Sequence, residues 1–233
     1  MIIFNGTELT NIAPVKIEDI QVSPISIAAV SRQRAIKFGS EFVRMSGSSR
    51  TITITFALLT ENSADREADM QKIRDWARTD GEYNLELPEF SNRHLECVCT
   101  EHPEHSYRKW WENKLKIVFT CFNNVFWTSN DLIEVPCGTY FSIGGSATPL
   151  VRIERNGSTA LGSVTYSNGI ESMTFKPLPA GQMVIDLNRQ LAYVGKTSIM
   201  SNYVNTSTFL VPRIGASQRI TGTGTVKYRE RWV

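Results

Sequence analysis

The stretch Leu178–Lys196, LPAGQMVIDLNRQLAYVGK, decides the fold class because it holds two strand-like segments around one turn. Apolar residues recur at every second position on each side of a turn at Asn188–Arg189. They are Met183, Ile185, Leu187, Leu191 and Tyr193. Alternation with a period of two is typical of a strand with one buried face. The stretch therefore predicts a tight β-hairpin whose five apolar side chains face a core.

The second half of the chain predicts strands only, separated by Gly, Asn, Pro and Ser. The expected strands are Leu150–Arg155, Gly162–Tyr166, Ser172–Lys176, Met183–Leu187, Leu191–Val194, Thr208–Val211, Gln218–Gly222 and Thr225–Arg231. Short strands at this spacing are typical of a β-sandwich or a jelly roll.

The first half combines strand patterns with the one strong helical pattern of the chain. Its expected strands are Ile2–Leu9 with an Asn-Gly turn, Ile17–Val22, Arg50–Leu59, Tyr83–Leu87, His94–Thr100 and Leu115–Asn123. The helix is expected over Ser63–Asp80, capped by Asn62 or Ser63 and ended by a left-handed Gly81. Its apolar stripe at helical spacing consists of Ala68 or Met70, Ile73 and Trp76–Ala77.

A chain of 233 residues is long enough for two domains. We expect a mainly β protein. Residues 1–130 are expected to form a β-sandwich with one α-helix (63–80) and a protruding hairpin. Residues 131–146 are expected to be a linker, and 147–233 a second β-sandwich.

The protruding hairpin is expected where charged and β-branched residues lack a clean buried face. Strands Ile27–Arg34 and Glu41–Arg44, joined near Gly39, would form it. A monomer gains little from such a hairpin, whereas a neighbouring subunit would satisfy its strand edges. The interface residues predicted on this basis are Arg32, Arg34, Lys37, Phe38, Glu41 and Arg44. A surface hairpin without a partner is the alternative.

Composition and charge argue against several classes of function. The formal net charge is +2; residues 1–130 carry 15 basic against 17 acidic residues, and 131–233 carry 10 against 6. Neither half has the basic excess of a nucleic-acid-binding domain. The sequence contains no run of 18 apolar residues, so it predicts no membrane-spanning helix. The start MIIFN lacks the charged region of a signal peptide. We therefore expect a reducing, cytosol-like compartment.

Chemical motifs are equally sparse. The sequence has no GxSxG, HExxH, GxxxxGK(S/T) or GxGxxG segment, so it predicts no enzyme and no cofactor. The one plausible metal group is Cys97, Cys99, His102 and His105. Its CxC and HxxH spacing is not that of a zinc finger, and Pro103 breaks any helix that would align the histidines. Buried thiols and surface histidines are favoured over a metal site or a Cys/His nucleophile pair.

One aromatic cluster is a candidate contact site. It consists of Tyr107, Trp110 and Trp111, beside Arg108 and Lys109. Such residues are enriched at hot spots of protein interfaces, and their rings also stack on sugars. Either a protein partner or a glycan would suit them.

In order and spacing along nearly the whole chain, these features resemble the distal tail proteins of siphophages and related prophages. In the first half the similar segments are the opening Asn-Gly hairpin, RTITITFALL, the helix stripe ending in Ile73 and Trp76, YNLELPE and LKIVFTCFNNVFW. In the second half they are LPAGQMVIDLNRQLAYVG, LVPRIG and the closing strand with KYRERW. The family's Pro-x-x-Gly segment, Gly-Thr-Gly turn and Tyr-Arg strand resemble Pro212–Gly215, Gly222–Gly224 and Tyr228–Arg229.

The resemblance implies that the first domain assembles as a hexameric ring at the tip of the tail, without an inserted carbohydrate-binding module. It implies a galectin-like β-sandwich for the second domain. The implied partners are further copies of the chain, the major tail tube protein, the tail-associated lysin or tail fibre, and the tape measure and receptor-binding proteins. DNA would cross the ring without being specifically bound. The implied location is the virion tail tip, after synthesis in the cytoplasm of the host bacterium.

Two other functions stay open. The first is a carbohydrate-binding β-sandwich module that attaches a virion or particle to the host cell wall through Tyr107, Trp110 or Trp111. The second half lacks a matching His/Asn/Arg/Trp sugar constellation, which disfavours sugar binding there. The other open function is that of a hydrolase without a recognisable motif.

Overall fold

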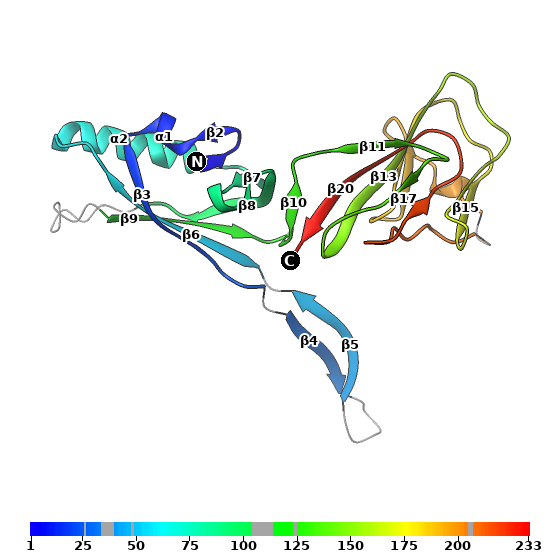
Figure 1. Cartoon of the computed structure of the whole chain (residues 1–233), viewed down its shortest axis with the longest axis horizontal. Helices are drawn as coiled ribbons and strands as arrows, with labels where there is room; N and C mark the ends of the chain where they lie inside the picture. The colour runs from blue at the N-terminus through cyan, green and yellow to red at the C-terminus, as the bar shows by residue number, and fades with distance from the viewer. Residues whose placement is uncertain (26, 34–39, 48, 104–113, 124, 205–206) are drawn as a thin grey trace. The chain divides into compact units, whose positions relative to one another are not determined.

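The structure is a computed structural model that describes all residues except 26, 34–39, 48, 104–113, 124 and 205–206. For residues 27–33 and 40–47 it describes the backbone only. The chain divides into two compact units, Met1–Trp127, coloured from blue to green in Figure 1, and Thr128–Val233, coloured from green to red. The described residues form mainly antiparallel β-structure with one long helix, which confirms the predicted fold class.

The first unit contains two antiparallel sheets that share one strand. Its strands are β1 (Ile3–Phe4), β2 (Thr7–Glu8), β3 (Val15–Val22), β4 (Ile27–Gln33), β5 (Ser40–Gly47), β6 (Arg50–Leu58), β7 (Tyr83–Glu86), β8 (Arg93–Glu101) and β9 (Lys114–Cys121). One sheet has the order β3-β6-β9-β8 and the other β8-β7-β1-β2. The shared strand β8 pairs with β7 along its first half and with β9 along its second. Ile52, Ile54 and Phe56 of β6 are fully buried, as the alternation predicts.

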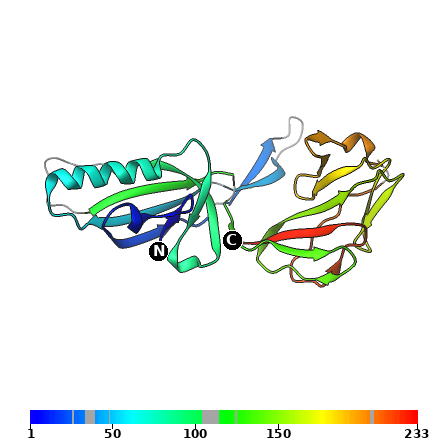
Figure 2. The same ribbon diagram turned by 90° about the horizontal axis from the view of Figure 1, so that it is seen from above.

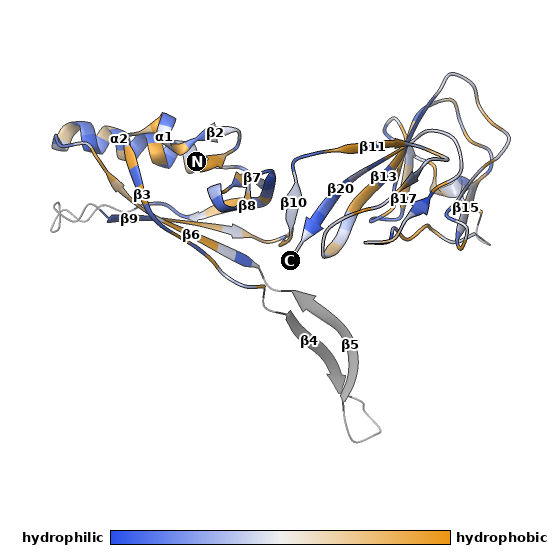
Figure 3. Ribbon diagram, viewed as in Figure 1, coloured by the Kyte–Doolittle hydropathy of each residue, from blue (hydrophilic) through white to orange (hydrophobic). Residues whose placement is uncertain are grey.

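The long helix α2 (Ser63–Ala77) runs along the strands of this unit (Figure 2). The first unit also contains a short helix, α1 (Leu9–Ile12), and a 3₁₀ turn, η1 (Pro88–Phe90). Hydrophilic and hydrophobic segments alternate along α2 in Figure 3. Its buried apolar residues are Met70, Ile73 and Ala77, so Met70 and not the exposed Ala68 continues the stripe.

Both ends of α2 have a physical cause. At the start, the Asn62 side chain accepts a hydrogen bond from Ala64 N at 3.1 Å, which confirms one of the two predicted caps. The helix ends at Ala77, three residues earlier than expected, because Arg78 adopts an extended conformation (φ −70°, ψ 125°). The prediction for Gly81 is wrong, because this residue lies beyond the extended segment and has no positive φ.

The expected hairpin is present. Strands β4 and β5 pair antiparallel, and in the part of the chain that the structure describes they pair only with each other. At the base of the hairpin, Ser23 N donates to Thr51 O at 2.8 Å and Ser23 Oγ accepts from Thr51 N at 2.7 Å. These bonds extend the β3–β6 ladder up to the point where the hairpin begins.

The second unit is a sandwich of one long-stranded sheet and one layer of short strands. Its strands are β11 (Ile133–Pro136), β12 (Tyr140–Phe141), β13 (Ala147–Gly157), β14 (Val164–Ser167), β15 (Ser172–Phe175), β16 (Gly181–Asp186), β17 (Leu191–Val194), β18 (Thr197–Ser198), β19 (Gln218–Arg219) and β20 (Thr225–Trp232). The boundary between the two units lies within β10 (Trp127–Ser129). The 3₁₀ turn η3 (Met200–Asn202) follows β18. The main sheet has the order β11-β20-β13-β16-β17-β18. The opposite layer consists of the pairs β14–β15 and β12–β19, connected by a bridge between Ser167 and Thr221. Tyr166, Phe175, Met183 and Ile185 lie fully buried in this unit's core.

The hairpin of β16 and β17 is present, but one of its faces differs from the prediction. Ile185 pairs with Ala192, which is 1% exposed, whereas Leu191 and Tyr193 are 47% and 37% exposed. Four residues, 187–190, separate the flanking pair Asp186 and Leu191, with Gln190 at φ +54°. This loop length places Ala192 on the buried face, since a shift by one residue exchanges the two faces of a strand.

Two further expectations differ from the structure. Thr208–Val211 forms no strand, because Val211 N donates to the Glu171 carboxylate at 2.7 Å instead of joining a backbone ladder. Its neighbours Phe209 and Leu210 are both buried, so the segment also lacks the alternation of a strand. Residues 131–146, expected as a linker, contain β11 and β12, which pair with β20 and β19. None of the helices in the described part of the chain has the length and apolarity to cross a membrane.

Candidate functional site

The predicted interface residues of the hairpin are only partly described. The backbone of Arg32 pairs directly with that of Glu41, and Arg44 pairs with Val30. Arg34, Lys37 and Phe38 lie outside the described residues. Their role in subunit contacts stays a prediction.

The aromatic cluster cannot be placed either. Tyr107, Trp110 and Trp111 fall in 104–113, between β8 and β9, outside the described residues. The predictions of a protein contact and of a sugar contact through them both stay open.

The cysteines and histidines near this segment do not gather around a common point. Cys97 is fully buried beside Cys121, whereas Cys99 Sγ lies 3.7 Å from His102 Nδ1; His105 is outside the described residues. Burial raises the pKa of the Cys99 thiol to about 11, and the hydrogen bond to Cys121, together with burial, raises the pKa of Cys97. Both shifts oppose the thiolate form that nucleophiles and metal ligands need. Among the described residues no group of three or more side chains could hold a metal ion.

The structure instead reveals a groove of about 490 Å³ on the second unit, here called the main-sheet groove. The residues that line it and matter here are Leu132, Leu150, Arg152, Tyr193, Lys227 and Arg229. Strand register brings them together, because Leu150 pairs with Arg229 and Arg152 with Lys227. Their sequence neighbours Val151 and Tyr228 point into the core, so the groove lies on the outer face of the sheet.

Ion pairs fix part of this outer face. Lys227 Nζ lies 2.7 Å from Glu134 Oε1 and 3.2 Å from Glu154 Oε2, and Arg152 Nε lies 2.7 Å from Glu154 Oε1. The two carboxylates, Glu134 first, raise the pKa of Lys227. The Arg229 side chain, by contrast, makes no ion pair or hydrogen bond with any residue that the structure describes. The Arg229 guanidinium can therefore form an ion pair with a partner that binds in this groove.

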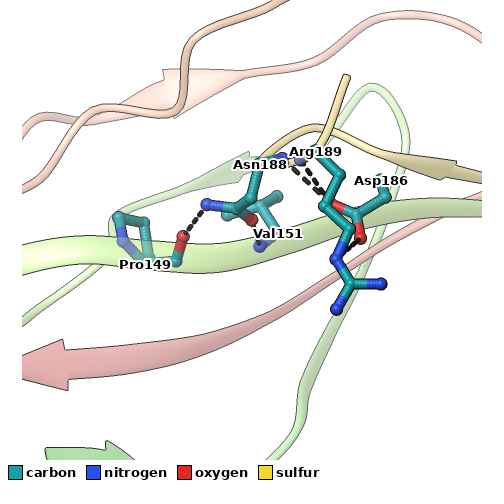
Figure 4. Close-up of polar contacts among 5 residues, drawn as sticks. All are labelled: Pro149, Val151, Asp186, Asn188 and Arg189. Atoms are coloured by element: carbon teal, nitrogen blue, oxygen red, sulfur yellow. Dashed lines mark hydrogen bonds and ion pairs between the residues drawn. The ribbon is translucent and has the colours of Figure 1, made fainter. Parts of the chain in front are cut away.

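The turn at one rim of the groove is held by side-chain hydrogen bonds (Figure 4). Asn188 Nδ2 donates to Pro149 O at 2.6 Å, and Asn188 Oδ1 accepts from Val151 N at 2.7 Å. Asp186 Oδ1 accepts from the backbone N–H groups of Asn188 and Arg189 at 3.0 and 2.9 Å. These bonds order the turn before any partner binds, which lowers the entropy lost on binding.

The main-sheet groove suits recognition better than catalysis. Its lining includes a tyrosine and several arginines, residue types that are enriched at hot spots of protein interfaces. Among the described residues that line it there is no cysteine, histidine or serine. Sequence analysis missed it because its residues span positions 132–229; the alternating outward charges of β13 and β20 were the one available signal.

No protein-family model and no curated protein matches the sequence. Among solved structures, the chain is similar to the Dit protein of phage SPP1, described as a paradigm of the hub adsorption apparatus in phages that infect Gram-positive bacteria. The TM-score is 0.75 at 13% identity, over 100% of this chain and 98% of the other. The chain has the fold of SPP1 Dit.

Two weaker similarities are to chains of the phage P2 baseplate in its activated conformation, one with calcium and one with strontium. The TM-scores are 0.48 and 0.44, at 9% and 11% identity. They cover 97% and 96% of this chain and 93% and 92% of the others. Scores below 0.5 add nothing to the fold assignment.

Proposed function

We propose that the chain is a structural hub protein of the tip of a long, non-contractile phage tail. The supporting observation is the similarity to SPP1 Dit, which runs through both units and nearly the full length of each chain. A shared fold does not by itself fix function, so the proposal also needs surfaces suited to assembly. The chain offers two of them.

The first surface is the β4–β5 hairpin, proposed as the contact between subunits of a hexameric ring. Within the described residues, each of its strands pairs on one side only. Unpaired strand edges favour pairing or packing with another chain. A neighbouring copy in a closed ring would cover them at the same place in every subunit.

The second surface is the main-sheet groove, proposed as the docking site of another tail protein. The ring would join the major tail tube protein to the tail-associated lysin or tail fibre, with tape measure and receptor-binding proteins as further partners. DNA would cross the lumen without specific binding. The hub would catalyse no reaction and would reside at the virion tail tip after synthesis in the bacterial cytoplasm.

Light scattering of the purified chain over a concentration series tests the ring. A hexamer has a mass of about 158 kDa, six times the chain mass of 26.3 kDa. A chain that remains monomeric at every concentration would contradict a ring formed by the protein itself.

A hairpin excision makes the test specific. Replacing residues 25–49 by Asn-Gly would join Pro24 to Arg50 through a two-residue turn, directly beyond the Ser23–Thr51 bonds. We expect this variant to keep the circular dichroism spectrum of the sandwich and to sediment as a monomer. A variant that still forms hexamers would show that the ring contact lies elsewhere.

The matched control is Trp110→Ala with Trp111→Ala, which leaves the hairpin intact. We expect it to keep the hexamer mass. Loss of cell-wall glycan binding by this variant, from a parent chain that is monomeric, would favour the carbohydrate-binding function instead.

A further inference from the structure

A second groove, of about 370 Å³, lies on the short-stranded layer of the second unit and is here called the arginine groove. Three segments distant in sequence meet there: β12, the turn 167–170 between β14 and β15, and the loop 213–217 together with β19, which directly follows it. Tyr140 of β12 pairs directly with Arg219 of β19. No residue of this groove takes part in the proposed docking surface.

The arginine groove carries positive charge without local compensation. Arg213 and Arg219 line it, and no aspartate or glutamate does. Neither guanidinium forms an ion pair with a residue that the structure describes. The nearest acidic residue in sequence, Glu171, has Oε2 occupied by hydrogen bonds from Val211 N at 2.7 Å and Asn168 Nδ2 at 3.0 Å. The groove therefore presents to a ligand two cationic groups that form no ion pair with a described residue.

A buried side chain holds the backbone at Arg213, and an aromatic ring contacts the guanidinium of Arg219. Gln218, 8% exposed, donates from Nε2 to Arg213 O at 2.8 Å and accepts at Oε1 from Arg213 N at 3.2 Å. Arg219 Cζ lies 5.1 Å from the centroid of the Tyr140 ring, within range of a cation–π interaction. Both arginine backbones thus belong to ordered segments, so the backbone contributes little to the conformational entropy lost when a ligand binds.

The turn 167–170 supplies apolar contact. Asn168 Oδ1 accepts from Ile170 N at 3.0 Å and from Glu171 N at 2.7 Å, and Gly169 adopts φ +89°. This turn displays Ile170 at 69% exposure, and Tyr140, which also lines the groove, is 67% exposed. An aromatic ring and an aliphatic side chain facing solvent beside these cationic groups suit a ligand with both a ring face and a negative group.

The dimensions suit a small ligand, because a groove of about 370 Å³ lies within the range of about 300–1,000 Å³ that small-molecule sites occupy. Guanidinium groups recognise carboxylates and phosphates through planar, charge-assisted hydrogen bonds. We propose that the arginine groove binds an anionic sugar unit, whose phosphate or carboxylate contacts Arg213 and Arg219 and whose ring packs on Tyr140 and Ile170.

Calorimetric titration of the full-length chain at low ionic strength tests this site. The probes are glucose 6-phosphate, glucuronate, inorganic phosphate and glucose. We expect the two anionic sugars to bind more tightly than inorganic phosphate, which lacks a ring, and glucose to show no binding. Raising the salt concentration should weaken binding of both anionic sugars, because screening acts on exposed charges.

Two variants of equal charge change locate the binding. Arg213→Gln with Arg219→Gln should weaken the affinity for glucose 6-phosphate at least about tenfold, since each charge-assisted bond contributes roughly a factor of ten. Lys176→Gln with Lys196→Gln removes two exposed charges elsewhere on the same unit and should leave the affinity unchanged. Thermal melting of both variants checks that the fold is retained.

Three outcomes would overturn the site. The first is no binding of either anionic sugar. The second is equal weakening in both double variants, which would indicate a nonspecific charge effect. The third is tighter binding of an acidic peptide such as hexa-glutamate, which would assign the groove to a protein partner. Because these titrations do not depend on ring formation, they stand whether or not the hub function holds.

Discussion

The two units complete their cores in different ways. In the first unit, the 15-residue helix α2 packs by Trp76 against Phe4 and Phe119 at centroid distances of 5.7 and 6.1 Å. In the second, the layer facing the main sheet consists of strands of only two to four residues. Short strands leave backbone groups unpaired, and side chains bond them: Tyr166 OH donates to Thr223 O at 2.9 Å and Tyr203 OH to Ser207 O at 2.5 Å. The first core therefore depends mainly on apolar packing, and the second also on side-chain hydrogen bonds to the backbone.

The largest effect of a single substitution is expected in the aromatic cluster of the first unit. Phe119 is fully buried, with its ring centroid 4.7 Å from that of Phe4. Phe119→Ala should lower the free energy of unfolding by about 3–5 kcal/mol through lost burial and the cavity left behind. Urea denaturation measures the loss. The control Phe122→Ala, at a side chain 56% exposed, should change stability by less than about 0.5 kcal/mol. A loss below about 1 kcal/mol at Phe119 would contradict the packing account.

The difference between the long elements of the first unit and the short strands of the second also explains which parts of the fold the sequence could predict. Periodicity located the strands of the first unit and the helix stripe, because long buried elements repeat their pattern several times. It placed Leu191 and Tyr193 on the wrong face, because loop length and not alternation sets the register of β17. It predicted a strand at Thr208–Val211, because a buried irregular segment is as apolar as a strand.

The candidate sites were less predictable than the fold. Tyr107, Trp110 and Trp111 are adjacent in sequence and draw attention as a cluster. Arg213 and Arg219 lie far from Tyr140 and Ile170 in sequence, and only the pairing of β12 with β19 and the bridge from Ser167 to Thr221 bring them together. Contacts of this kind depend on topology, which local patterns do not encode.

The next prediction tests the polar contribution in the second unit. Asn188→Ala removes two hydrogen bonds to the backbone, to Val151 N and Pro149 O. We expect a loss of about 2 kcal/mol in the free energy of unfolding, because both backbone groups lose their partner in a partly buried turn. Arg189→Ala, in the same turn but with a side chain 79% exposed, should cost less than about 0.5 kcal/mol. Equal effects of the two substitutions would remove the distinction drawn between the units.

The smallest effect should come from the one buried carboxylate of the first unit's helix, and it should depend on pH. Asp69, 6% exposed, accepts hydrogen bonds from Lys72 Nζ and Thr60 Oγ1, each at 2.7 Å. The bond from Lys72, then that from Thr60, lowers the pKa of this carboxyl below its usual value of about 3.9. A lowered folded-state pKa stabilises the protein above about pH 4 and loses that contribution as the pH falls through the folded-state value.

Asp69→Asn should therefore cost about 1 kcal/mol at pH 7, a small value because Lys72 is 58% exposed and its ion pair is screened by solvent. The difference from the parent chain should shrink as the pH is lowered from 5 towards about 2. Urea denaturation at several pH values measures it, with Asp75→Asn on the exposed side of the same helix as the control. If Asp69→Asn proved as costly as Asn188→Ala, polar anchoring would matter equally in both units, and the bond from Thr60 to Asp69 would hold the helix in place as much as its apolar stripe does.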